Sequence, residues 1–536
     1  MFFVKDIGSI YTDWKTRMKI KAKLETCAKT IKDNLGITIL VAIMAVIYAY
    51  VMFTNKPWYD ELYTYYSFIS RGPVYAAIHW PVPNNHVGYS VLSACLDIFG
   101  NPYIGLRGVS YLASLANMIL IYRLTDRFMK REYALSSVVL YVCANLVFSL
   151  SVQGRGYTLA TTCYLMSILC CYHICVGEVK TRHYIGIALW FALGLYVLPS
   201  SLYWVLPICA VGGLFLLFRM EWKKFGLYFA SAVAGALITL FLYTLIWLAI
   251  GSNLMCKNPE NPYYGVYQVT IILKAPFAAL KTGIDYMLAT PYIQSIDRLT
   301  ATRGMLGYFK ELFDLYYANC GIALVIITIS IILFCFWYGV KHFRNRRVEY
   351  WLALYLVVSL LSVPVMLLIQ SVHPYKRVFS FYMVPIAIGI AYCLYRCMTY
   401  CLDEKYQKRV AVILFAIILV LGGLRFTSYD YRRPYADREN SLHEVFDMVD
   451  AKSIESIYYT DDFQKYVLKF YYDAEPEEKS LEEAQYVLVY REMLKPEIQS
   501  VDWPLMVTYD RDMLAEIFYH FEPIASNDVY EVYARK

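Results

Sequence analysis

Long apolar runs recur through almost the whole chain and constrain its fold more than any other feature. Runs near twenty residues match the hydrocarbon thickness of a bilayer, because an α-helix rises about 1.5 Å per residue. The 536 residues are 59% hydrophobic and only 17% charged, which is too apolar for a soluble domain of this length. The sequence therefore predicts an α-helical polytopic membrane protein.

We place eleven membrane spans, each near the length that a bilayer requires. They are residues 37–53, 104–122, 133–152, 156–176, 184–198, 202–218, 226–250, 316–339, 351–369, 378–397 and 409–425. The orientation of every later segment depends on Pro199-Ser200-Ser201, where two short spans must turn sharply. If those two spans were a single helix, everything downstream would be inverted.

The distribution of Lys and Arg sets the orientation, because basic connections remain in the cytoplasm. With an internal N-terminus all five inner connections are basic: Arg123–Arg131, Lys180–Arg182, Arg219–Lys224, Lys341–Arg347 and Arg396–Arg409. The net charge of +7 lies largely in such segments and does not imply a nucleic-acid partner. The same alternation places five segments on the outer face: 54–103, Gln153–Arg155, 251–315, 370–377 and everything after Arg425.

Three regions follow from this topology. Residues 1–35 are basic and are expected to lie along the cytoplasmic face, attracted by anionic lipid. Residues 36–426 hold the spans and two outer loops, 54–103 with two short interfacial helices and the proline-containing 251–315. Residues 427–536 contain no Gly and many charges, which predicts a small periplasmic α/β domain.

The C-terminal domain has its own local signals. Ser441 and Glu444 form a capping box that is expected to open a helix. Phe463, Tyr466, Val467 and Phe470 recur at helical spacing, and three segments are expected to be strands: Ile454–Tyr459, Tyr486–Tyr490 and Val529–Tyr533.

Most of the fourteen cysteines lie inside apolar runs, where they act as small hydrophobic residues. No Cys/His spacing predicts a zinc site. If both face the oxidising side, Cys256 and Cys320 can pair.

Polar residues that the topology leaves on the outer face form the candidate site. The acidic pair Asp60-Glu61 follows the first span and either supplies a general base or caps a short helix. The other members are Asn84, Asn85, His86, Gln153, Arg155, Tyr157, His373, Lys376 and Arg377. A base, amides and cations together suit an anionic head group and the deprotonation of a hydroxyl.

Each of these residues also has a simpler structural interpretation. Lys376 and Arg377 can be interfacial anchors whose charges reach the head groups. Adjacent cations on an outer loop nevertheless run against the positive-inside bias, which favours a bound anion. Arg155 can equally be an anchor, and His86 alone is more often structural than catalytic.

Four motifs resemble those of bacterial polyprenyl-phosphate-sugar transferases. Asp60-Glu61 followed by Asn85-His86-Val87-Gly88-Tyr89 resembles their "DE … HPPLYY" pattern. The other three are Gly105–Val109, similar to "RLPS"; Gln153–Tyr157, similar to "EARGYAL"; and Lys376-Arg377 with Phe379–Pro385, similar to "RYLLPLLP". These enzymes belong to the GT-C superfamily, which includes the protein O-mannosyltransferases of glycosyltransferase family 39 and the lipid A aminoarabinose transferase.

The resemblance implies a glycosyltransferase of the bacterial inner membrane that moves a sugar from a polyprenyl-phosphate donor to a glycolipid, glycan or protein acceptor. It implies transfer on the outer face with inversion at the anomeric carbon, Asp60 as the general base, and Glu61 orienting the acceptor or capping the helix. Arg107, within the second motif, and Arg155 become further candidates for binding the donor phosphate.

The chain also departs from the family pattern. Val87 and Gly88 replace the family's prolines, and Asn84 or Asn85 replaces an acid that some relatives carry. This argues against a second catalytic carboxylate and against a carboxylate-based metal site, so a requirement for a divalent metal ion stays open.

Two other classes of protein remain as alternatives: a transporter or flippase for lipid-linked sugar, and an O-antigen ligase or polymerase. Transporters carry ionisable residues near the bilayer midplane, often on broken helices. The predicted spans are nearly free of Asp and Glu, which favours chemistry at the membrane surface.

Overall fold

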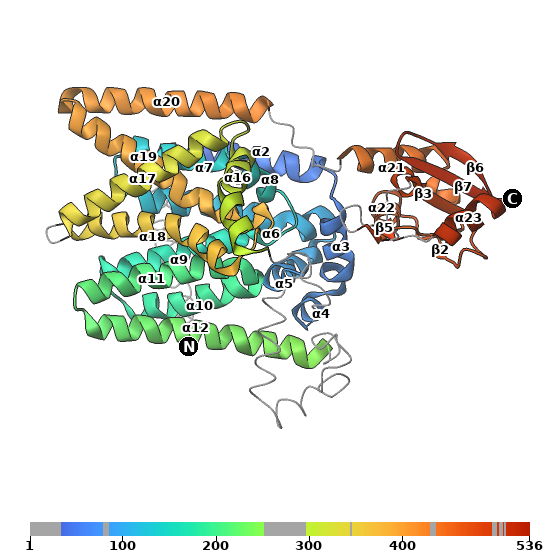
Figure 1. The fold of residues 1–536 in the computed structure, drawn as a ribbon, viewed down its shortest axis with the longest axis horizontal. Helices are drawn as coiled ribbons and strands as arrows, with labels where there is room; N and C mark the ends of the chain where they lie inside the picture. Colours follow the sequence, from blue (N-terminus) through green and yellow to red (C-terminus); the bar gives the residue numbers. More distant parts are fainter. Residues whose placement is uncertain are drawn as a thin grey trace, which may run out of the picture.

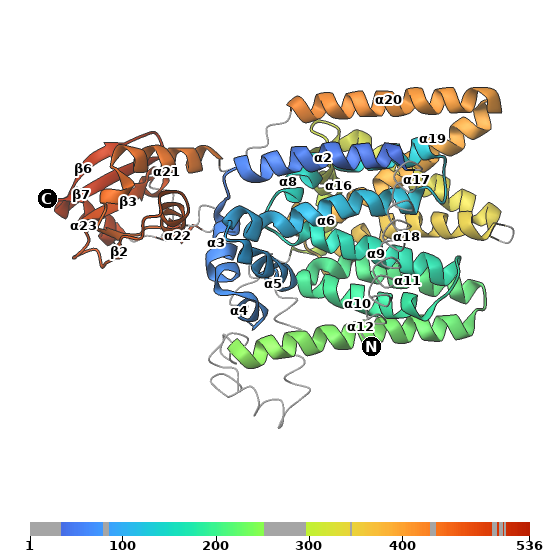
Figure 2. The same ribbon diagram turned by 180° about the vertical axis from the view of Figure 1, so that it is seen from behind.

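The computed structural model describes residues 34–78, 85–250, 296–343, 346–428, 436–495, 501–502, 507–508 and 511–536. These residues form a helical bundle with a small sheet-containing domain at one end (Figures 1 and 2). The predicted fold class is confirmed. Most of the basic segment 1–35, most of the loop 251–315, Asn84 and Cys256 lie outside the described residues.

A helix occurs at every predicted span. In chain order they are α2 (Leu35–Thr54), α6 (Pro102–Thr125), α7 (Arg131–Val142) with α8 (Asn145–Ser151), α9 (Tyr157–Cys175), α10 (Thr181–Val197), α11 (Leu202–Phe218), α12 (Trp222–Ile250), α17 (Gly321–His342), α18 (Arg347–Gln370), α19 (Met383–Cys401) and α20 (Glu404–Ser428). Among the described residues, nine helices are long and apolar enough to cross a membrane, or ten with the bent pair α7–α8. The remaining predicted span is α10, which has 17 residues and packs mainly on α9 and α12.

The predicted span 133–152 is a bent pair of helices, not one straight helix. The axes of α7 and α8 differ by 74°. Ala144 between them is extended, with φ −73° and ψ 121°, and an extended residue interrupts the hydrogen-bond ladder of a helix. Helix α8 then packs on α6, α9, α16 (Arg298–Tyr316) and η4 (Lys376–Tyr382), and it leads the chain into residues 152–156.

Helices α10 and α11 are separate, as the orientation requires. A short 3₁₀ turn, η3 (Pro199–Ser201), joins them after Leu198, which is extended. The Ser201 hydroxyl donates a hydrogen bond to the carbonyl oxygen of Gly194 at 2.7 Å and closes the turn.

The five basic connections gather at one end of the bundle. Figure 1 shows the turns α11–α12, α17–α18 and α19–α20 at the end that points away from the C-terminal domain. Lys130 Nζ donates to Gln407 Oε1 at 3.1 Å and joins the first connection to the fifth. Arg347 donates to the carbonyl oxygen of Cys175 at 2.8 Å and pairs with Glu221 at 2.6 Å, joining the other three.

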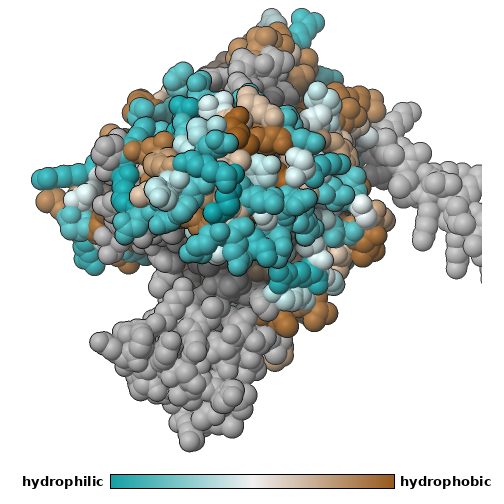
Figure 3. Space-filling view, turned by 90° about the vertical axis from the view of Figure 1, so that its right-hand side faces the viewer, coloured by the Kyte–Doolittle hydropathy of each residue, from teal (hydrophilic) through white to brown (hydrophobic). Residues whose placement is uncertain are grey.

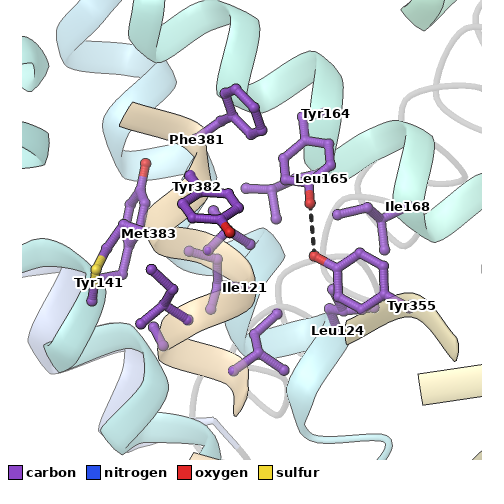
Figure 4. Close-up of a cluster of buried hydrophobic side chains, with 14 of the residues drawn as sticks. Ile121, Leu124, Tyr141, Tyr164, Leu165, Ile168, Tyr355, Phe381, Tyr382 and Met383 are labelled. Atoms are coloured by element: carbon purple, nitrogen blue, oxygen red, sulfur yellow. Dashed lines mark hydrogen bonds between the residues drawn. The ribbon is translucent and has the colours of Figure 1, made fainter. Parts of the chain in front are cut away.

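Tyrosine supplies much of the bundle core, and several of its hydroxyl groups form hydrogen bonds there. In Figure 4, Tyr164 of α9 and Tyr355 of α18 share a hydrogen bond of 3.0 Å between their hydroxyl oxygens. Tyr382 donates to the carbonyl oxygen of Leu360. A tyrosine paired in this way buries its ring without leaving its hydroxyl unsatisfied, so it can take the place of an aliphatic residue in this core.

Short elements cover the end of the bundle next to the C-terminal domain. The described part of residues 54–103 holds three short α-helices where two were expected: α3 (Tyr59–Ser67), α4 (Pro73–Ile78) and α5 (Val87–Leu96), with the 3₁₀ turns η1 (Ile69–Arg71) and η2 (Asp97–Phe99). Asn101 fixes the start of α6 by accepting hydrogen bonds from the N–H groups of Tyr103 and Ile104 at 3.0 and 3.2 Å.

The C-terminal domain contains a five-stranded mixed sheet in the order β2-β1-β3-β7-β6. Its strands are β1 (Ser456–Tyr458), β2 (Glu477–Glu478), β3 (Tyr486–Tyr490), β6 (Phe521–Ser526) and β7 (Tyr530–Arg535); β4 (Val501–Asp502) and β5 (Val507–Thr508) pair separately. Strand β1 is parallel to β2 and β3, and β7 is antiparallel to β3 and β6. The helices are α21 (Ala436–Met448), α22 (Asp462–Val467), a π-helix (Leu468–Tyr472) and α23 (Arg511–His520), with 3₁₀ turns η5 (Ala451–Ser453) and η7 (Arg491–Leu494).

The three predicted strands and the helix through Phe463 and Val467 are confirmed. The predicted capping box is wrong, because α21 already begins at Ala436 and Ser441 lies inside it. The carbonyl oxygen of Ser441 instead accepts a hydrogen bond from Asn527 at 2.7 Å. The face of this domain seen in Figure 3 is largely hydrophilic, as expected for a domain in water.

The topology predicts that the C-terminal domain and the α19–α20 turn lie on opposite sides of the membrane. Ser526 and Asp403 are both exposed, so each can be replaced by Cys with little structural cost. In intact spheroplasts, an impermeant maleimide should label Ser526→Cys from outside and label Asp403→Cys only after permeabilisation. The unsubstituted chain measures the background from native cysteines, and the reverse labelling pattern would overturn the orientation.

Candidate active site

The site begins at the N-terminus of α3, where Glu61 caps the helix. Trp58 precedes the helix in an extended conformation, and its N–H donates to Glu61 Oε2 at 3.3 Å. A glutamate at the third helical position serves this role in a capping box. Of the two roles that the sequence suggested for the acidic pair, general base or helix cap, Glu61 therefore has the role of the cap. Successive helical residues differ by about 100° in direction, so Asp60 is directed elsewhere.

Glu61 also forms a buried ion pair with Arg107 of α6. Arg107 Nε lies 2.7 Å from Glu61 Oε1, and Arg107 Nη2 lies 3.0 Å from Oε2, which makes the contact bidentate. The side chains are 0% and 1% exposed. Arg107 Nη1 donates to the carbonyl oxygens of Met52 and Asn55, both at 2.7 Å. This pair joins the end of α2 to α3 and α6.

The Gly154-Arg155-Gly156 segment joins the same assembly through its backbone. The N–H of Gly154 donates to Glu61 Oε1 at 2.7 Å. A Cβ atom at Gly154 would lie 2.4 Å from Leu106 Cδ1, and one at Gly156 would lie 3.2 Å from the His86 ring. Both glycines therefore permit a close backbone approach that a larger residue would block.

Asp60 lies between two arginines. Arg377 Nη2 is 3.2 Å and Arg155 Nη2 is 3.9 Å from Asp60 Oδ2, and the carboxylate side chain is 11% exposed. Oδ2 accepts no hydrogen bond from the described residues. The backbone on this turn is fixed by Thr64, whose hydroxyl donates to the Asp60 carbonyl oxygen at 2.7 Å. Asp60 is therefore held in place while one carboxylate oxygen keeps hydrogen-bonding capacity.

Arg155 is oriented by Thr64 and His86. Its Nη1 donates to Thr64 Oγ1 at 2.9 Å, and its Nη2 lies 3.1 Å from His86 Nε2. The N–H of Gly156 donates to His86 Nδ1 at 2.8 Å. Burial, and then the charges of Arg155 and Arg377, hold the pKa of His86 well below its usual range. His86 is thus a neutral residue in contact with Arg155.

Arg377 is surrounded by aromatic rings. Its guanidinium carbon lies 5.3 Å from the ring centre of Trp58 and 5.2 Å from that of Tyr375. Tyr157, the first residue of α9, packs its ring edge-on against the His86 ring in the same group, with centroids 5.1 Å apart. Arg377 Nε and Trp58 Nε1 are buried and have no hydrogen-bond partner among the described residues. Together with Asp60 Oδ2, these atoms form a small group of polar atoms around Arg377 that can still hydrogen-bond to a bound molecule.

An open groove of about 710 Å³ runs from Arg377 toward α16. Its wall combines apolar residues such as Leu146 and Leu315 with the cationic loop His373–Arg377. Lys376 Nζ pairs with Glu311 of α16 at 2.5 Å. The His373 ring stacks on Tyr308 with centroids 4.9 Å apart, and its buried Nε2 has no hydrogen-bond partner among the described residues.

The structure brings most of the sequence-predicted site residues together at this end of the bundle. Asp60, Arg155, His86, Tyr157 and Arg377 form one connected group, Glu61 and Arg107 form the buried pair beside it, and His373 and Lys376 line the groove. Asn85 instead links α4 to α5, donating to the carbonyl oxygen of Ala76 and accepting from Ser90 at 2.6 Å.

Sequence reasoning missed Trp58, Thr64, Gly154, Tyr308 and Glu311. Trp58 and Thr64 flank the acidic pair at helical spacing, which is a signal that could have identified them. Tyr308 and Glu311 lie on α16, within a loop expected from the sequence, and only the fold brings them to Arg377.

No group of three or more His, Cys, Asp or Glu side chains that could hold a metal ion occurs in the described ranges. Asp60, the acid nearest the centre of the site, faces cationic partners instead.

Comparison with known proteins agrees with this architecture. Residues 86–247 match the family described as dolichyl-phosphate-mannose-protein mannosyltransferase. ArnT from Cupriavidus metallidurans bound to undecaprenyl phosphate is similar in structure, with a TM-score of 0.52 and 12% sequence identity over 93% of this chain and 97% of ArnT. The apo state of that ArnT gives a TM-score of 0.53 and 11% identity over the same shares. No curated protein matches the sequence.

The chain has the membrane fold of the GT-C superfamily, and the resemblance inferred from the four motifs is confirmed.

The buried pair predicts different consequences for the two neighbouring acids. Glu61→Gln leaves Arg107 buried without its anion, which commonly costs about 3–5 kcal/mol of folding free energy. The thermal unfolding temperature of the detergent-solubilised protein should therefore fall clearly for Glu61→Gln. Asp60→Asn should unfold within about 2 °C of the unsubstituted protein, because the carboxylate makes looser contacts; a change of under 1 kcal/mol corresponds to such a small shift in a chain of this size. Equal unfolding temperatures for all three proteins would contradict the role of the Glu61–Arg107 pair.

Proposed function

We propose that this protein transfers a sugar from a polyprenyl-phosphate donor to an acceptor on the outer face of the membrane, with Asp60 as the general base. The observation that carries the proposal is the Asp60 carboxylate itself, which is nearly buried between Arg155 and Arg377 with Oδ2 available for a hydrogen bond. A base needs one oxygen free to receive a proton from a positioned hydroxyl.

The groove beside Arg377 supports the assignment of the donor. Its apolar wall at Leu146 and Leu315 suits an isoprenoid chain, and its cationic end at Lys376 and Arg377 suits a phosphate. Two nitrogens of one arginine can contact two phosphate oxygens at once. The bound undecaprenyl phosphate of the structurally similar ArnT is a lipid of this chemistry.

The proposed reaction is a single displacement. The acceptor hydroxyl oxygen attacks the anomeric carbon as the bond from that carbon to the phosphate oxygen breaks. The hydroxyl proton passes to Asp60, and the electron pair leaves with the polyprenyl phosphate. Arg377 exchanges its contact with Asp60 for the departing phosphate, where a cation in a poorly solvated site stabilises the developing charge. Attack opposite the leaving group inverts the anomeric centre.

The remaining residues position these two groups in the proposal. Thr64 and Arg155 fix the turn that carries Asp60, His86 packs against Arg155, and the rings of Trp58 and Tyr375 flank Arg377. Glu61 and Arg107 hold the supporting elements together and are proposed as positioning residues because their polar atoms are engaged with each other and with backbone groups.

We further propose the bacterial inner membrane as the location, with the N-terminus cytoplasmic and the C-terminal domain periplasmic. A flippase or transporter is less well supported, because the charged residues of the site lie on short elements and helix ends at one end of the bundle. The alternative of an O-antigen ligase or polymerase shares the lipid-linked donor and differs in the acceptor.

Asp60→Asn should lower the rate of transfer from a lipid-linked sugar donor by about a hundredfold to ten-thousandfold, which is the usual loss on removing a general base. The amide has nearly the same shape as the carboxylate but cannot take the proton. Asp97→Asn is a matched control, because Asp97 lies in the same outer segment and hydrogen-bonds to Tyr65 away from the site. Turnover of Asp60→Asn close to that of Asp97→Asn would refute the assignment of the base.

Arg377→Ala should raise the donor concentration needed for half-maximal transfer and lower the maximal rate, because the phosphate loses its bidentate partner. Arg377→Lys should recover only part of both, since an ammonium group lacks the planar fork. Arg298→Ala controls for the loss of an exposed positive charge on α16. An unchanged donor dependence and rate for Arg377→Ala would make this loop an interfacial anchor and leave Arg155 as the better candidate for the phosphate.

A further inference from the structure

The nine-residue helix α3 is amphipathic, with an aromatic side and a polar side. Tyr59, Leu62, Tyr63 and Tyr66 recur at positions i, i+3, i+4 and i+7, which lie along one side of an α-helix. Asp60, Glu61 and Thr64 lie on the other side and contact Arg377, Arg107 and Arg155. The polar side belongs to the candidate site, and the aromatic side faces away from it.

The C-terminal domain covers the aromatic side. Tyr466 of α22 stacks on Tyr66 with ring centroids 5.6 Å apart and planes inclined by 11°. The same ring lies 6.2 Å from Tyr59 and 6.2 Å from Tyr63. Leu62 is fully buried and belongs to the hydrophobic core of the C-terminal domain. Helix α3 is therefore part of that core.

A second contact reaches the partner of Glu61. Phe470, in the π-helix that follows α22, lies 5.4 Å from Tyr103 at the start of α6 and 6.3 Å from Tyr65 of α3. The Arg107 guanidinium lies 5.7 Å from the Tyr103 ring. The C-terminal domain thus contacts both elements that carry the Glu61–Arg107 pair.

Packing of this kind is needed because a helix of nine residues is too short to be stable alone. Isolated helices shorter than about 12–15 residues are marginal in water. Helix α3 is held on one side by ion pairs and on the other by the aromatic contacts with the C-terminal domain. A displacement of about 1 Å at a reacting group can cost about a hundredfold in rate.

We propose that the C-terminal domain is a brace for the catalytic turn, and that Tyr466 is a positioning residue that keeps Asp60 aligned through α3. This inference rests on the proposed role of Asp60. Tyr466 touches neither substrate nor reacting atoms in this arrangement. Its removal is therefore expected to lower kcat more than it weakens donor binding in the groove.

The test compares full-length Tyr466→Ala and Tyr466→Phe with Ile517→Ala as the matched control. Ile517 is a fully buried core residue of the same domain on α23, and its truncation weakens the domain without removing a ring from α3. For Tyr466→Ala we expect kcat to fall about tenfold to a hundredfold with the donor KM within about twofold. Tyr466→Phe keeps the ring and should retain at least about half of the kcat. At temperatures where it stays folded, Ile517→Ala should have the same kcat as the unsubstituted protein.

Hydrogen–deuterium exchange of the backbone amides of residues 59–67 gives a readout that is independent of activity. Exchange should accelerate in Tyr466→Ala but not in Tyr466→Phe or Ile517→Ala. Unchanged exchange in Tyr466→Ala would overturn the brace. Accelerated exchange with unchanged kcat would overturn the positioning role if Asp60→Asn is inactive. If Asp60→Asn is instead fully active, the proposed function itself fails, and the two failures are thereby distinguished.

Discussion

The outer end of the bundle depends on the ion pair between Glu61 and Arg107. Burying two charges is costly unless their geometry is good and their remaining hydrogen-bonding groups are satisfied. Here the guanidinium also reaches two backbone carbonyls at the end of α2, and the carboxylate also accepts N–H groups from Trp58 and Gly154. One pair therefore joins three stretches that are distant in sequence, around residues 52–61, 107 and 154, and the neighbouring residue Asp60 takes its position from them.

The two adjacent carboxylates differ because their environments differ. Glu61 is enclosed and has its oxygens engaged, whereas Asp60 faces two arginines at longer distances beside an open groove. Loosely paired charges near a groove can exchange partners when an anion enters, and a closed bidentate pair cannot do so without unfolding its surroundings. The contrast supports a division of roles in which Glu61 stabilises the frame and Asp60 carries out the chemistry.

The sequence predicts the parts of this structure that have local or periodic signals. The lengths of the apolar runs predicted the positions of the helices, and the basic connections predicted which helix ends lie on the same side of the membrane. The acidic pair, Arg155 and Arg377 were expected on one face of the membrane. The bend at Ala144 has no proline or glycine to announce it, and an arginine at the start of a span looks the same whether it pairs with Glu61 or with a phosphate. The stripe Tyr59, Leu62, Tyr63 and Tyr66 was visible, but its partner Tyr466 lies far along the chain.

The burial of Leu62 in the C-terminal domain has a consequence for biogenesis. Helix α3 leaves the ribosome long before the elements that cover it, because these elements begin only at Ala436. Contacts between segments so distant in sequence form late, because the intervening chain must be ordered before they are gained. The membrane bundle can therefore be inserted while its outer end is unfinished, and a part of the chain that is synthesised later closes the core around an earlier one.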